Sequence, residues 1–95
     1  MLRLANTIDE TVALLRANGE PHFAERIVPV AQDVRAGNPS AVERILVETT
    51  GAMGSLRDVA LYRDGAYLPN NSAFQALIAS MRDQARSILQ RGSHA

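Results

Sequence analysis

The stretch NNSAFQALIASMRDQARSILQ, residues 70–90, decides the fold class because its apolar side chains recur at helical spacing. Residues three or four apart lie on one face of an α-helix. Asn70, Asn71 or Ser72 can cap the start, and Arg86 and Arg91 complement the negative end of the helix dipole. We therefore predict a long amphipathic helix with one apolar stripe, formed by Phe74, Leu77, Ile78, Met81, Ala85 and Ile88.

The first segment of the chain has the same periodicity. Asn6 or Thr7 is a candidate cap for its start, and Gly19 is a candidate stop because glycine readily takes the left-handed conformation that ends helices. The spacing predicts a helix whose buried stripe consists of Leu4, Ile8, Val12 and Leu15.

A second apolar stripe runs through residues 23–34. Pro21 suits the first turn of this helix, where its missing N–H leaves no hydrogen bond unmade. Pro29 cannot donate to the Glu25 carbonyl, so we expect a kink or a break there. Ala36-Gly37 is the expected end of the segment.

The third helix is predicted to start at Asn38-Pro39, with Asn38 as the cap and Pro39 in the first turn. Gly51 is its expected end. After it, Asp64-Gly65 separates two short apolar runs, a pattern that favours a tight turn. The buried face of this third helix is predicted to be Val42, Ile45, Leu46 and Thr49.

These segments together predict a mainly α protein, a small bundle of about four helices. A short β-hairpin or an extended excursion is expected between the third helix and the fourth. Residues 1–91 form one predicted helical domain, and residues 92–95 a frayed C-terminal tail.

Composition excludes several chemistries. Ten arginines balance ten acidic residues, so no basic stripe for nucleic acid is expected. The sequence has no lysine for a Walker A loop or a Schiff base, and no cysteine for a thiolate site or a disulfide. No run of apolar residues is long enough to cross a bilayer. We expect a cytoplasmic protein with no cofactor, no metal site and no membrane or nucleic-acid partner.

Helical periodicity does not explain the stretch from Gly51 to Asp58. In a structural interpretation Ser55 caps a short turn and Asp58 reaches back to its amide. In a functional interpretation the backbone N–H groups of the loop bind an anion, and Arg57 adds positive charge. The candidate ligand-binding residues are Gly51, Met53, Gly54, Ser55, Arg57, Asp58 and His22, the one histidine in the body of the chain.

This stretch resembles a family of small bacterial proteins of unknown function that have a Gly-Gly-Met-Gly-Ser-x-x-Asp motif and an upstream aromatic residue, usually tryptophan. The resemblance also covers Leu14-Leu15-Arg16 through Gly19-Glu20 and His22-Phe23-Ala24, and so most of the chain. The sequence departs from the family at Ala52, Phe23 and Arg57, where the family has glycine, tryptophan and often asparagine. The resemblance names no reaction, although an immunity role against a toxin would suit small proteins of this type.

A serine hydrolase is disfavoured, because the residues around Ser55 lack the Gly-x-Ser-x-Gly elbow. The sequence favours a non-catalytic protein-interaction module of bacterial origin, an immunity or adaptor protein. Tyr62 and Tyr67 are its candidate partner-binding residues. The alternative is a small-molecule or anion binder, or an enzyme, that uses the Met53-Gly54-Ser55 loop. A third hypothesis is a homo-oligomer. The apolar Leu14, Val28 and Leu89 lie off the main stripes, and they either widen the core or mark an interface.

Overall fold

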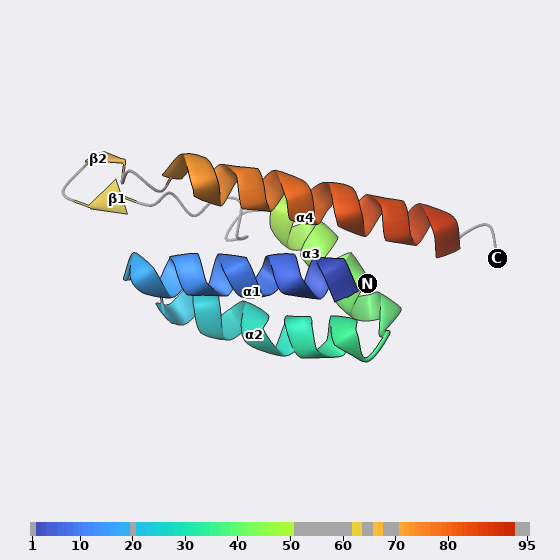
Figure 1. The fold of residues 1–95 in the computed structure, drawn as a ribbon. Helices are drawn as coiled ribbons and strands as arrows, with labels where there is room; N and C mark the ends of the chain where they lie inside the picture. The colour runs from blue at the N-terminus through green and yellow to red at the C-terminus, as the bar shows by residue number, and fades with distance from the viewer. Residues whose placement is uncertain (1, 20, 51–61, 64–65, 68–70, 93–95) are drawn as a thin grey trace.

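The computed structural model describes residues 2–19, 21–50, 62–63, 66–67 and 71–92 (Figure 1). Within these ranges it shows four helices, which confirms the predicted mainly α class and the number of helices. The helices are α1 (Leu2–Ala17), α2 (Pro21–Arg35), α3 (Pro39–Thr50) and α4 (Asn71–Gly92).

Two short strands, β1 (Tyr62–Arg63) and β2 (Ala66–Tyr67), lie between α3 and α4 in the chain. They are antiparallel, with Tyr62 opposite Tyr67 and Arg63 opposite Ala66. Residues 64–65, which would form the turn, lie outside the described residues. The hairpin therefore stays a prediction.

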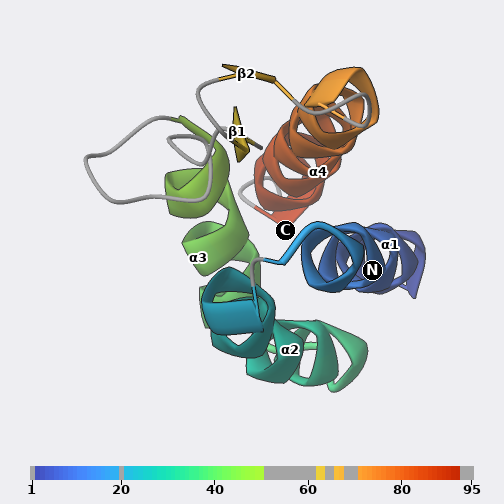
Figure 2. The same cartoon turned by 90° about the vertical axis from the view of Figure 1, so that its left-hand side faces the viewer.

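The helices form a ring around a common core. Figure 2 shows the bundle nearly end-on, with α1 packed against α2 and α4, and α3 packed against the same two helices. The predicted stripes supply this core. Its fully or nearly fully buried side chains include Leu4, Ile8 and Leu15 of α1, Ile27 and Val34 of α2, Val42 and Ile45 of α3, and Phe74, Ile78 and Met81 of α4.

The apolar residues that lie off the main stripes widen this core. Leu14, Val28 and Leu89 are partly buried and pack against the buried cluster. They therefore contribute to folding through the apolar area that they remove from water.

Two contacts join the first helix to the last. The hydroxyl of Thr11 donates a hydrogen bond to the sulfur of Met81 in the buried core, at 3.7 Å. Closer to the surface, the amide of Gln84 donates to the hydroxyl of Thr7, at 3.0 Å. Helices that are distant in sequence are thus held side by side by both apolar packing and polar contacts.

The predicted start of the first helix is wrong. α1 begins at Leu2, so Asn6 and Thr7 lie inside the helix and cannot cap it. The hydroxyl of Thr7 instead donates to the carbonyl of Arg3, four residues earlier, at 3.0 Å. Tertiary packing favours the extension of α1 to Leu2, since Leu4 and Ala5 in its first turns are completely buried.

α2 is continuous from Pro21 to Arg35, so no break occurs at Pro29. Ile27 before the proline and Ala31 after it are both buried in the core. Because these contacts hold both halves of the helix, they offset the loss of one backbone hydrogen bond. The predicted start of α2 at Pro21 is confirmed.

The connection between α2 and α3 agrees with the sequence prediction. The oxygen Oδ1 of Asn38 accepts a hydrogen bond from the backbone N–H of Ser40 at 3.0 Å, as a helix cap does. Gly37, just before this cap, has a φ of 83°, a left-handed conformation that glycine adopts without steric cost.

We expect Gly37→Ala to destabilise the protein by about 1–2 kcal/mol, the cost of a Cβ in the left-handed region. No atom lies within 4 Å of the added Cβ, so backbone strain is the whole effect. Urea denaturation measures this difference. Gly37→Asn serves as the matched variant and should cost less, because asparagine tolerates this conformation better. Equal losses in the two variants would show that the strain argument does not hold.

Candidate functional site

Most of the predicted ligand-binding residues cannot be placed. The loop candidates Gly51, Met53, Gly54, Ser55, Arg57 and Asp58 lie outside the described residues. The two candidate partner-binding residues, Tyr62 and Tyr67, are opposite each other in the backbone pairing of β1 and β2. Their side chains lie outside the described part of the structure.

His22 is exposed near the start of α2. Its ring contacts the ring of Phe23 edge to face, with the centroids 5.6 Å apart and the planes at 80°. This is a favourable arrangement for two aromatic rings. His22 thus lies at the surface of the bundle, next to a half-buried aromatic side chain.

A buried carboxylate lies between α2 and α3. The side chain of Glu48 is 5% exposed, and both of its oxygens accept hydrogen bonds from the Nη2 atom of Arg26 at 2.6 Å. The Nε atom of Arg44, one helical turn before Glu48, lies 3.6 Å from Oε1. Burying a carboxylate is costly unless it is paired, and here two guanidinium groups offset that cost.

Arg26 connects this ion pair to the aromatic residues at the start of α2. Its guanidinium lies over the ring of Phe23, 5.2 Å from the centroid, within the range of a cation–π interaction. His22, Phe23, Arg26, Glu48 and Arg44 therefore form one connected set of side chains, which we name the α2–α3 polar cluster.

The α2–α3 polar cluster marks where the predicted loop attaches. Glu48 belongs to the last turn of α3 and contacts Arg26 in the first half of α2, so the two helices run antiparallel. Thr50 ends α3 near the end of the bundle where α2 begins at Pro21, next to His22. The chain continues from Thr50 into the Gly51–Asp58 segment.

A groove adjoins the cluster, between α2 and α3. It has a volume of about 520 Å³, and we name it the α2–α3 groove. Val47 is 52% exposed and is one of two large apolar side chains that the described surface leaves open to solvent. The lining combines apolar Val30, Ala41 and Val47 with charged Arg26, Asp33, Glu43 and Arg44, and with polar Asn38 and Ser40.

Of this cluster, sequence reasoning named only His22 as a candidate and missed the ion pair, although a signal was present. Arg26 lies three residues after Phe23 and next to Ile27, and Glu48 lies three residues after Ile45 and next to Thr49. Both are charged residues next to an apolar stripe. Two opposite charges next to the stripes of neighbouring helices indicate an ion pair between those helices.

The described residues contain no group of three or more His, Asp or Glu side chains that could hold a metal ion. None of the described helices is long and apolar enough to cross a membrane. No family model, curated protein or solved structure matches this chain. The resemblance to the proteins with the Gly-Gly-Met-Gly-Ser-x-x-Asp motif therefore stays a prediction.

Proposed function

We propose that this protein is a non-catalytic interaction module whose α2–α3 groove receives a segment of a partner protein. The observation that carries the proposal is the exposure of Val47 in a concave, charged setting. Protein interfaces combine an apolar centre with a polar rim. Val47 and Val30 supply the apolar centre, and Arg44 and Asp33 belong to the charged rim.

The ion pairs of the described helices support a structural role for their charges. Glu48 is held by Arg26 and Arg44, which fixes α3 against α2. On the other side of α2, Arg16 pairs with Glu25 at 2.9 Å. The Arg16–Glu25 pair is exposed and contributes little, whereas the buried Glu48 pair holds α2 and α3 together, and a surface held in this way binds a partner with a smaller loss of entropy.

A bacterial immunity or adaptor protein is the form of this proposal that the family resemblance favours. The short hairpin between α3 and α4 belongs to the same proposal. Tyr62 and Tyr67 would be anchors on it, because tyrosine supplies a large contact area at low entropic cost.

We expect Val47→Asp to weaken partner binding about tenfold, because it places a charge at the apolar centre of the groove. The fold should lose less than about 0.5 kcal/mol, since Val47 is largely exposed. The measurement is affinity purification from cells that make the protein, followed by titration of the partner that is recovered.

Leu2→Asp is the matched control, because Leu2 is also an exposed aliphatic residue, at 65%, and does not line this groove. It should bind the partner like the unchanged protein. Equal losses in the two variants, or binding that survives Val47→Asp, would contradict the assignment of the groove.

The alternative function is anion binding by the Met53-Gly54-Ser55 loop. The observation in its favour is that this segment continues from α3 near the end of the bundle that carries His22. Inorganic phosphate should then raise the melting temperature, and Gly54→Val should abolish that effect. Stabilisation of this kind in a protein that recovers no partner would favour the alternative over the interaction module.

A further inference from the structure

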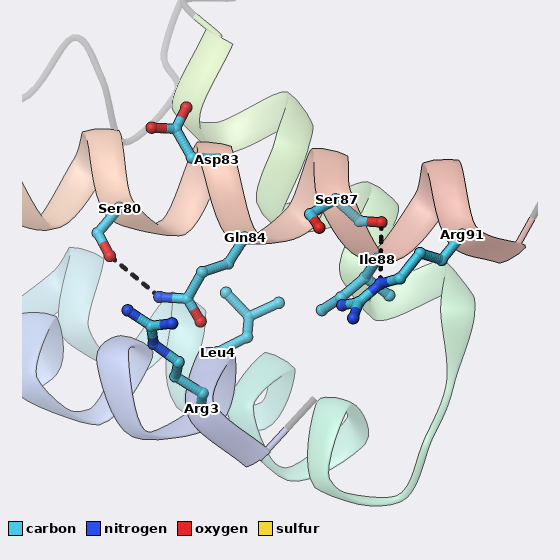
Figure 3. A pocket seen from close by; sticks show the side chains of 8 residues that line it. All are labelled: Arg3, Leu4, Ser80, Asp83, Gln84, Ser87, Ile88 and Arg91. Atoms are coloured by element: carbon cyan, nitrogen blue, oxygen red, sulfur yellow. Dashed lines mark hydrogen bonds between the residues drawn. The ribbon is translucent and has the colours of Figure 1, made fainter.

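A second hollow, of about 570 Å³, lies between α1 and α4, and we name it the α1–α4 groove (Figure 3). Arg3 enters it from α1 and Arg91 from α4, with the side chains of Leu4 and Ile88 between them in the view of Figure 3. A volume of this size is typical of small-molecule sites. The groove thus combines two positive charges with a small apolar surface.

Within the described residues, the two arginines of this groove differ from the other arginines of the helices that form ion pairs. In the described part of the chain, no carboxylate lies within ion-pairing distance of Arg3 or of Arg91. Asp83 also lines the hollow, but it pairs with Arg82 at 3.3 Å, and Figure 3 shows its carboxylate projecting away from Arg3 and Arg91. By contrast, five other arginines each pair with a carboxylate: Arg16, Arg26, Arg35, Arg44 and Arg82.

The polar groups of the groove are held in place by the helices. The amide nitrogen of Gln84 donates to the hydroxyl of Ser80 and to that of Thr7, both at 3.0 Å. The Nε atom of Arg91 donates to the carbonyl of Ser87 at 3.3 Å, which orients its guanidinium along α4. Arg3 lies in the first turn of α1, where the helix dipole is positive and no acidic residue is present.

We propose that the α1–α4 groove binds a small organic anion. Its phosphate or carboxylate group lies between Arg3 and Arg91, because guanidinium groups bind such oxyanions through charge-assisted hydrogen bonds. Its aliphatic part packs on the half-buried Ile88, beside the fully buried Leu4. This site is separate from the α2–α3 groove and from the Gly51–Asp58 segment in sequence.

The experiment is an NMR titration of the whole chain with inorganic phosphate, butyl phosphate and pentanoate, against chloride at equal ionic strength. Saturable shifts are expected at the amides around Arg3 and Arg91. Butyl phosphate should bind about fivefold more tightly than phosphate, because its chain buries apolar area. Comparison of butyl phosphate with pentanoate identifies the preferred oxyanion.

Arg3→Gln and Arg91→Gln should each weaken binding about tenfold, since each removes one charge-assisted contact. Both residues are exposed, so both variants should keep the thermal midpoint of the unchanged protein. Arg86→Gln is the matched control, because Arg86 is an exposed arginine of α4 that does not line the groove. Its affinity for the anion should not change.

Three results would overturn the proposal. The first is shifts that do not saturate or that chloride reproduces. The second is an equal loss of affinity in Arg86→Gln, which would indicate general attraction to a positive helix. The third is phosphate binding that survives Arg3→Gln and disappears in Gly54→Val, which would place the anion at the loop and support the alternative function instead.

Discussion

Phe74→Ala is expected to lower the free energy of unfolding by about 3–5 kcal/mol, the usual cost of truncating a buried phenylalanine. Phe74 is the largest of the fully buried side chains and lies at 0% exposure near the start of α4. Its removal takes away the one aromatic ring among the buried side chains of the described core. A cavity remains because the surrounding helices relax only partly.

Urea denaturation followed by circular dichroism at 222 nm measures this loss. Leu2→Ala is the control, since Leu2 is 65% exposed and its truncation should change stability by less than about 0.5 kcal/mol. Phe74→Leu should fall between the two, because it retains part of the apolar volume. A loss below about 1 kcal/mol for Phe74→Ala would contradict the position of α4 against the core.

Glu48→Ala is expected to cost about 2–4 kcal/mol, because it leaves the Arg26 guanidinium next to the core without its main carboxylate. Arg26 is itself 27% exposed, so water compensates part of the loss and the value lies towards the lower end for buried pairs. The measurement is again the free energy of unfolding from urea denaturation.

The double variant Arg26→Met with Glu48→Leu tests whether the loss of stability comes from leaving one charge unpaired or from losing the ion pair itself. Both charges are then replaced by apolar groups of similar size, and stability should return to within about 1 kcal/mol of the unchanged protein. Asp9→Ala is a matched control, because Asp9 pairs with Arg35 at the surface, where an ion pair contributes less than about 1 kcal/mol. If Glu48→Ala lowered the free energy of unfolding no more than Asp9→Ala, the buried ion pair would contribute no more to stability than a surface pair.

The helical core was predictable because its signal is local. Each stripe repeats every three or four residues, and most of its side chains are buried, whereas others, such as Leu77 and Val30, are only half-buried. The left-handed Gly37 and the capping Asn38 were predictable for the same reason, since their roles depend on the residues beside them.

The errors concern features that depend on packing between helices. Thr7 has the chemistry of a cap, but the burial of Leu4 and Ala5 extends α1 past it to Leu2. Pro29 was expected to kink or break α2, and the break does not occur because core contacts on both sides keep the helix continuous. In both cases tertiary contacts outweigh a local preference of about 1–3 kcal/mol.

The two grooves could not be predicted from the sequence, because each is formed by residues of two helices. Val47 and Val30 line one groove only because α2 and α3 are neighbours, and Arg3 and Arg91 line another only because α1 and α4 are neighbours. The loop at Gly51–Asp58 was a candidate for the opposite reason, since it is a local motif that periodicity leaves unexplained. Local sequence patterns therefore indicated a site in a loop, whereas the two grooves form only when the helices pack together.

The contacts between α1 and α4 also bear on how the chain folds. Thr11 and Met81 are 70 residues apart in sequence, and Thr7 and Gln84 are 77 apart, whereas α1 with α2 and α2 with α3 form antiparallel pairs over short connections. Closing a long loop costs more chain entropy than closing a short one. Until α4 docks, the apolar stripe of α1 that packs into the shared core is open to water and to other chains. Among the described helices α4 is made last, so this apolar stripe stays open at least until α4 has been synthesised.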